Sequence, residues 1–167
     1  MKRVMNIHNR RAPLGVLLVA MVSGISASAA EPDGRRERGE AMLNRITADE
    51  GRRVVESLSD ISPELGDWII EFAYGDVFSG TELSLCTREL ATVSALTALG
   101  NARPQLKVHI DGALNVGCSP DAIVAVIIQM AVYSGFPSAL NGVSAAREVF
   151  ADRGVGISTA NSRTGER

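Results

Sequence analysis

Start and stop signals for consecutive helices occur along most of the chain, and they limit what it can fold into more than any other feature. Ser119-Pro120 offers an N-cap followed by a proline at the first helical position, and Pro104 begins another helix in the same way. Gly100 stops the long apolar segment that precedes it. No alternating strand pattern of useful length interrupts this order. The sequence therefore predicts an all-α fold, with helices over 51–58, 63–75, 81–99, 104–117, 120–134 and 138–153.

The first 30 residues have the order of a secretory signal: basic residues, then "APLGVLLVAMVSGI", then "SASAA". We expect cleavage after Ala29 or Ala30 and a periplasmic or secreted protein. Arg10-Arg11 raises the twin-arginine route as an alternative to the general secretory one. The expected divisions are a signal peptide at 1–30, a polar linker or N-terminal helix at 31–46, one helical domain at 47–153 and a disordered tail at 154–167.

Charge and cysteine content restrict the partners that we expect. Removing the signal leaves 13 basic and 19 acidic residues, a net charge of −6. An acidic chain without a Lys/Arg run argues against nucleic acid, and against a membrane after signal cleavage. In an oxidising compartment Cys86 and Cys118 could form one disulfide, which the sequence leaves open. We expect Cys86 to be a small buried residue and Cys118 to be exposed.

The segment "DAIVAVIIQMAVYSG" at 121–135 is apolar on nearly every side of a helix. A domain of this size can hardly bury such a helix alone. We therefore expect part of this helix to lie in a subunit interface of a homo-oligomer. Tyr133 in this segment is interpreted as a core or interface residue, with the alternative that its hydroxyl reaches a pocket.

Two ionisable side chains lie on apolar helix faces. Glu89 shares a face with Val93 and Leu96, and His109 shares one with Leu106. If the two helices pack antiparallel across "GNAR", Glu89 and His109 can meet and form a proton-transfer pair. The alternative interpretation is a structural pair, since an inward histidine is more often a satisfied core residue than a catalyst.

Arg88 lies about 100° further round the same helix than Glu89, so we expect it to border a cleft rather than simply pair with Glu89. The sequence suggests no metal site, since His109 and His8, in the signal, are the two histidines of the chain. We also find no glycine-rich phosphate loop of recognisable spacing.

The residues from Thr87 to Phe150 contain "TREL", "H-x-x-x-ALN-x-G" and "AVYSGFPSALN" in this order. Together these motifs resemble the carboxymuconolactone decarboxylase family. The resemblance implies an alkyl hydroperoxidase D-like helical bundle that assembles as a homotrimer or homohexamer, with active sites near subunit interfaces. It also implies catalytic roles for His109, Glu89 and Arg88. We further expect substrate contacts from Arg88, Gln129, Tyr133 and Cys86.

The superfamily has two chemical branches. The peroxidase branch carries Cys-x-x-Cys just before the histidine, where this chain has Ala102 and Gln105. The decarboxylase branch needs no thiol, metal or cofactor. We therefore predict an exported carboxy-lyase of the kind used in aromatic compound catabolism, acting by decarboxylation or proton transfer on a small unsaturated lactone or carboxylate. The alternatives are a peroxiredoxin-type activity of Cys86 or Cys118, and a non-catalytic oligomer that binds a ligand.

Overall fold

The computed structural model describes residues 32–157, and all regular structure in this range is helical. The expected signal peptide and most of the expected tail lie outside the described residues. The helices are α1 (Pro32–Thr47), α2 (Asp49–Glu56), α3 (Pro63–Trp68), the π-helix η1 (Ile69–Phe78), α4 (Leu85–Leu99), α5 (Arg103–Asn115), α6 (Pro120–Ser134) and α7 (Phe136–Arg153). The predicted all-α class is confirmed for this part of the chain.

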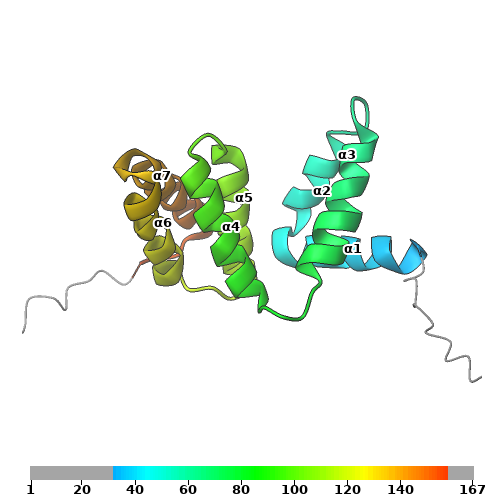
Figure 1. The fold of residues 1–167 in the computed structure, drawn as a ribbon, viewed down its shortest axis with the longest axis horizontal. Helices are drawn as coiled ribbons and strands as arrows, with labels where there is room; N and C mark the ends of the chain where they lie inside the picture. Colours follow the sequence, from blue (N-terminus) through cyan, green and yellow to red (C-terminus); the bar gives the residue numbers. More distant parts are fainter. Residues whose placement is uncertain (1–31, 158–167) are drawn as a thin grey trace, which may run out of the picture.

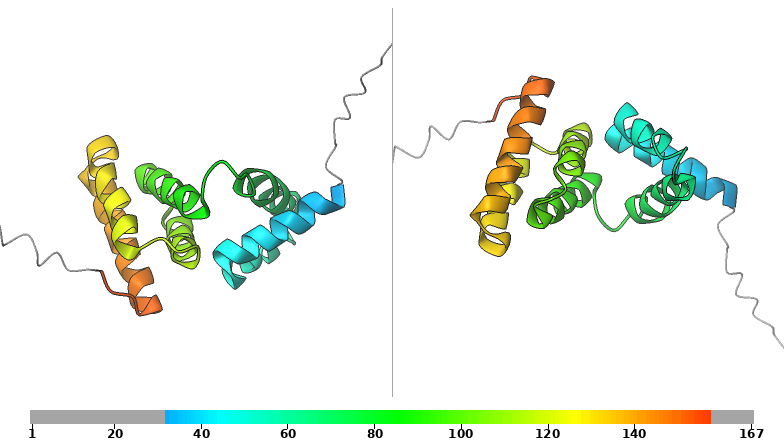
Figure 2. Two further views of the ribbon diagram at one scale, coloured as in Figure 1. Left: turned by 90° about the horizontal axis from the view of Figure 1, so that it is seen from below. Right: turned by 90° about the horizontal axis from the view of Figure 1, so that it is seen from above.

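The helices form two groups, joined by the segment at 79–84 (Figure 1). In the C-terminal group α4 packs on α5, α6 and α7, and α7 also packs on α5 and α6. In the N-terminal group α1 packs along η1, and it also reaches α5 of the other group. Figure 2 shows both groups from below and above, with α7 on the far side of the C-terminal group from α1. The contact between α1 and α5 therefore sets how the groups face one another.

Each group has its own apolar core. Leu43 and Ile46 of α1 pack with Ile70 and Tyr74 of η1 in the N-terminal group. The larger core lies between α4, α5, α6 and α7 and is built from Val93, Leu106, Ile110, Ala113, Cys118, Ile123, Ile127, Ala145, Ala146, Val149 and Phe150. Burial of this apolar surface supplies the main driving force for packing the helices.

Two glycines allow α1 and η1 to lie unusually close together. A Cβ on Gly39 would lie 2.1 Å from the carbonyl oxygen of Ile70, and one on Gly75 would lie 2.8 Å from that of Arg35. Both distances are shorter than a carbon and an oxygen can approach without a shift of backbone. The close crossing fixes the position of η1, which carries two aromatic residues of the candidate site.

Two elements differ from the sequence prediction. The helix expected over 63–75 becomes α3 followed by the π-helix η1, which continues to Phe78. The helix expected from 81 begins at Leu85, because the Ser84 side chain caps it by accepting a hydrogen bond from the Thr87 amide.

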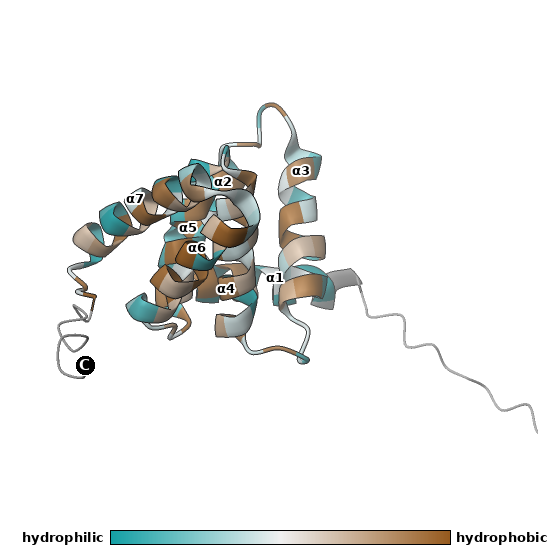
Figure 3. Ribbon diagram, turned by 60° about the vertical axis from the view of Figure 1, so that its left-hand side comes forward, coloured by the Kyte–Doolittle hydropathy of each residue, from teal (hydrophilic) through white to brown (hydrophobic). Residues whose placement is uncertain are grey.

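As the sequence predicts, this chain alone does not bury every apolar side of α6: Ile123 and Ile127 are buried, while Ile128, Val132 and Tyr133 are exposed. Figure 3 shows α6 mainly in the brown of hydrophobic residues. Within residues 32–157 no helix is both long and apolar enough to cross a bilayer.

Candidate active site

Glu89 lies on the inward face of α4, as its spacing from Val93 predicts. Its side chain is 0% exposed, so its carboxylate has lost all contact with water. Such a group must be hydrogen-bonded or lose its charge, because an isolated buried charge is too costly. The position of Glu89 therefore demands a partner from a neighbouring helix.

That partner is His109 of α5. The two helices run antiparallel across the turn at Gly100, and His109 Nδ1 lies 3.0 Å from Glu89 Oε2. With Glu89 ionised, Nδ1–H donates to Oε2, and Nε2 remains to accept a proton. The contact between Glu89 and His109 that the sequence suggested is present.

The second oxygen of Glu89 has no hydrogen-bond partner among the described residues, although it is fully buried. Gly112 of α5 lies beside the carboxylate, and a Cβ there would come within 3.4 Å of Oε2 and 2.9 Å of an Ile46 methyl group. Burial, and then the charge of Glu89, raise the pKa of the Tyr74 hydroxyl. Tyr74 therefore stays neutral at physiological pH next to the pair.

The His109 ring opens onto a cleft of about 390 Å³ between α5 and the N-terminal helices. The rings of Phe78 and His109 lie 6.3 Å apart, and those of Tyr74 and Phe78 lie 5.1 Å apart. The complete lining is Leu43, Thr47, Glu50, Gly51, Val54, Ile69, Ala73, Tyr74, Phe78, Pro104, Gln105, Val108 and His109. A histidine backed by a buried carboxylate at the wall of an apolar cleft is suited to moving a proton to or from a bound molecule.

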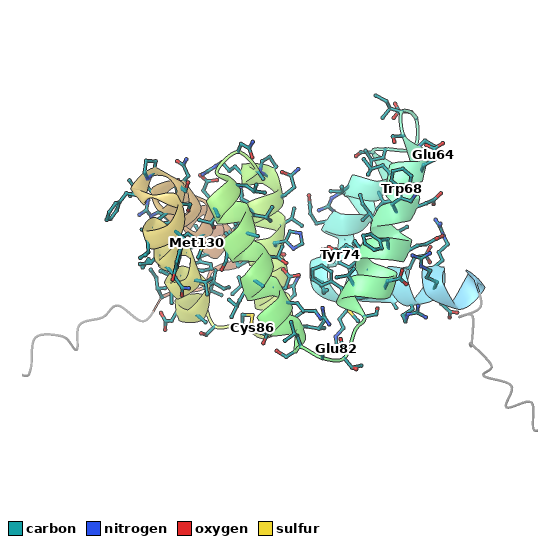
Figure 4. All side chains as sticks on the ribbon, in the orientation of Figure 1. Glu64, Trp68, Tyr74, Glu82, Cys86 and Met130 are labelled. Carbon is teal, nitrogen blue, oxygen red and sulfur yellow. A yellow bond between two sulfur atoms is a disulfide. The ribbon has the colours of Figure 1, made fainter. Side chains whose placement is uncertain are left out.

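Arg88 does not line this cleft. Its Nη2 donates to Glu82 Oε2 over 3.1 Å, while its Nε is buried without a partner among the described atoms. The side chain of Arg88 is 14% exposed and that of Glu82 is 79% exposed. Figure 4 shows Glu82 on the segment that joins the two groups of helices. One donor of Arg88 is therefore engaged by a carboxylate of the protein itself, and its Nε is not.

The other three expected binding residues also lie outside the cleft. Gln129 and Tyr133 are exposed residues of α6, which packs on α4 and α7. Cys86 forms a disulfide with Cys118, at the beginning of α4 in Figure 4. The expectation that Cys118 is exposed is wrong: it is 5% exposed, because the turn after α5 folds it against α4.

Tyr74 and Phe78 were not recognised as site residues from the sequence. Both come from η1, and they reach the site because α1 holds η1 against α5. Their spacing of four residues in an apolar helix was the available signal, but any packed helix shows the same pattern. In the part of the chain that the structure describes, no cluster of His, Cys, Asp and Glu could hold a metal ion.

The similarity of this chain to known proteins extends over the helices that build the candidate site. A family model described as "Carboxymuconolactone decarboxylase family" matches residues 63–148, from the beginning of α3 into α7. The chain belongs to the carboxymuconolactone decarboxylase family. The family match therefore includes the helices that carry Tyr74, Phe78, Glu89 and His109.

Individual relatives agree with this assignment. A 4-carboxymuconolactone decarboxylase from Acinetobacter baylyi is 32% identical over 109 residues, which are 65% of this chain and 81% of that protein. An uncharacterized 15.0 kDa protein from Paracoccus denitrificans is 28% identical over 99 residues, covering 59% of this chain and 74% of its own length. Peroxisomal protein 2 from Saccharomyces cerevisiae is 29% identical over 96 residues, covering 58% of this chain and 34% of its own length. Family membership and the decarboxylase relative support a decarboxylase-like function.

Proposed function

We propose that this protein is a cofactor-free enzyme in which His109 and Glu89 transfer a proton on a small unsaturated lactone or carboxylate. The observation that carries the proposal is the 3.0 Å contact between Nδ1 of His109 and a wholly buried Glu89 at the wall of a cleft. The similarity to a protein named 4-carboxymuconolactone decarboxylase favours a carboxy-lyase among the reactions that such a pair could catalyse.

Both forms of the reaction use the same proton carrier, Nε2 of His109. In decarboxylation the C–CO₂ bond breaks, its electron pair enters the conjugated carbonyl system, and Nε2–H of the imidazolium protonates the resulting carbanion. In proton transfer without CO₂ loss, neutral Nε2 removes a proton from a carbon next to the conjugated system and returns it to another carbon. Glu89 stabilises the imidazolium in both cases.

Arg88 makes one hydrogen bond to Glu82 and its Nε has no partner among the described atoms, so it keeps donors for a substrate carboxylate. Arg88, Gln129, Tyr133 and Cys86 would all need a second copy or a rearrangement to reach the cleft. We propose export to the periplasm or beyond, with which the disulfide between Cys86 and Cys118 agrees. No observation favours a peroxidase over proton transfer, since neither cysteine lines the cleft.

The test follows deuterium incorporation and CO₂ release when the purified protein is incubated in D₂O with unsaturated lactones, including 4-carboxymuconolactone. We expect deuterium to be incorporated into at least one lactone. In His109→Gln and Glu89→Gln the rate of incorporation should fall roughly 10²- to 10⁴-fold, which is the usual contribution of a general acid-base group. Glu64→Gln, an exposed change on α3, is the matched control and should retain the wild-type rate. Absence of both incorporation and CO₂ release, or full activity in His109→Gln, would contradict the proposal.

A further inference from the structure

The disulfide joins the open end of the hairpin that α4 and α5 form. Cys86 lies in the first turn of α4, and Cys118 lies in the turn between α5 and α6. The turn at Gly100 closes the other end of this hairpin. Glu89 and His109 both lie between the two cysteines in the sequence. The chain and the disulfide therefore enclose the candidate catalytic pair in one covalent loop.

The two cysteines lie in surroundings of different rigidity. Cys118 belongs to the larger apolar core, and its amide donates a hydrogen bond of 2.9 Å to the carbonyl oxygen of Ala113. Cys86 is half-buried, and the helix that carries it begins directly after the irregular segment at 79–84 (Figure 4). The disulfide therefore anchors the beginning of α4 to a part of the core that other contacts already hold.

Glu89 depends directly on the first turn of α4. In an α-helix each amide donates to the carbonyl four residues before it, so the Glu89 amide bonds to Leu85, the first residue of α4. Helix ends open more readily than helix interiors, because their first turn has fewer hydrogen bonds. Here the Ser84 cap and the ion pair of Arg88 with Glu82 lie at the surface. Without the disulfide, this turn can fray and release the backbone bond of Glu89.

The contact between Glu89 and His109 tolerates little displacement. Oε2 of Glu89 meets Nδ1 of His109, while Oε1 has no partner among the described residues. A hydrogen bond weakens steeply when it is stretched or misaligned. A shift of Glu89 would therefore leave a buried carboxylate without its partner, and it would free the His109 ring to adopt the other tautomer.

We infer that the disulfide between Cys86 and Cys118 is a positioning device that keeps Glu89 on His109, so that the catalytic pair is complete only in the oxidised protein. The inference rests on the proposed function in taking this pair as the reacting groups. A dithiol reductant opens the disulfide: its thiolate attacks one sulfur, the S–S bond breaks, and its second thiol resolves the mixed disulfide. Two electrons and two protons pass to the cysteines, and the reductant leaves as a cyclic disulfide. With the proposed export, the protein becomes active only in a compartment where the disulfide forms.

The test compares the oxidised and reduced proteins by NMR of the ¹⁵N-labelled His109 ring, assigned with His109→Gln, under alkaline conditions that leave the imidazole neutral. In the oxidised protein we expect the proton on Nδ1, because Nδ1–H donates to Glu89. After reduction with a dithiol, the ring nitrogens should report a mixture of both tautomers. The Glu89 amide should exchange with D₂O at least about tenfold faster, because the first turn of α4 frays. Reoxidation should restore both signals.

Reduction should also lower the rate of deuterium incorporation into the lactone about 10²-fold, the loss expected when a catalytic group is misplaced by about 1 Å. The double variant Cys86→Ser/Cys118→Ser should behave like the reduced protein with or without the reductant. Val149→Ala is the matched control, because it removes a buried side chain of α7 from the same core without changing either cysteine. It should lower the free energy of unfolding but keep the oxidised tautomer and the slow exchange of the Glu89 amide.

Three results would overturn the inference: an unchanged His109 tautomer and Glu89 exchange rate after reduction, complete unfolding of the reduced chain, or the same tautomer change in Val149→Ala. The NMR measurement needs no substrate, so it separates this inference from the proposed function. A tautomer change on reduction, with no deuterium incorporated into any lactone by the oxidised protein, would reject the proposed reaction and retain the positioning role. Incorporation that requires His109 but proceeds equally fast in the oxidised and reduced proteins would retain the reaction and reject the positioning role.

Discussion

At the scale of single residues, the state of the Glu89 carboxylate separates the catalytic interpretation from the structural one. A carboxylate that only stabilises a core is expected to use both oxygens, because each unsatisfied buried acceptor costs about 1 to 3 kcal/mol. Here Oε2 is paired with His109, while Oε1 has no partner among the described residues. An unsatisfied Oε1 therefore favours the catalytic interpretation, in which Glu89 orients and stabilises the His109 ring at the wall of the cleft.

Tyr74 gives a prediction about stability at alkaline pH. Burial and Glu89 raise its pKa in the folded protein above the ordinary tyrosine value of about 10. The unfolded chain releases this proton first, so the free energy of unfolding should fall as pH rises above about 10, by up to about 1.4 kcal/mol per pH unit. Tyr74→Phe should remove this component in urea unfolding curves from pH 8 to 11. Equal dependence of the unfolding free energy on pH in the wild-type protein and in Tyr74→Phe would refute the prediction.

Sequence reasoning found the contact between Glu89 and His109, because helical spacing and a short turn determine which inward residues can meet. The same reasoning could not place Arg88, since its partner Glu82 lies in the irregular segment at 79–84. Local patterns in the chain do not determine where such a segment runs. Cys118 was misplaced for a similar reason, because its burial depends on how the turn between α5 and α6 folds back on α4.

At the scale of elements, the prediction succeeded where proline, glycine and serine fix a helix end. The bounds of α5 and α6 follow Pro104, Ser119 and Pro120 to within a few residues. The π-helix was missed, because its apolar residues do not distinguish it from an α-helix. π-helical turns occur frequently at functional sites, and η1 supplies both aromatic side chains of the cleft.

The disulfide gives a prediction at this scale, because it ties the beginning of α4 to the turn between α5 and α6. Cys86 and Cys118 are 32 residues apart in the sequence. Closing a loop of this length is expected to stabilise the fold by roughly 3 to 4 kcal/mol through the entropy of the unfolded chain. In urea unfolding curves, adding a reductant should lower the free energy of unfolding of the wild-type protein by this amount. The double variant Cys86→Ala/Cys118→Ala should be insensitive to the reductant, and an unchanged midpoint for the reduced wild-type protein would contradict the expectation.

At the scale of the whole molecule, the C-terminal group presents an apolar surface that the described chain does not cover. The large exposed apolar residues of α6 and α7 are Ile128, Val132, Tyr133, Phe136 and Leu140. Val132 is 78% exposed and Tyr133 is 77% exposed. Extended exposed apolar surfaces of this kind mark sites of protein association. The sequence indicated this surface as an excess of apolar residues, but not which face of α6 would remain exposed.

We predict that this surface joins copies of the chain in a homotrimer or homohexamer. Light scattering coupled to size-exclusion chromatography should give three or six times the mass of the purified chain. Val132→Glu should shift the protein toward the monomer, because an interface that closes over this position would bury an unpaired carboxylate. Ala41→Glu, at an exposed position of α1, adds the same charge away from this surface and should leave the mass unchanged. A wild-type protein that remains monomeric at high concentration would show that α6 and α7 keep this surface exposed, and it would leave Gln129 and Tyr133 without a route to the cleft.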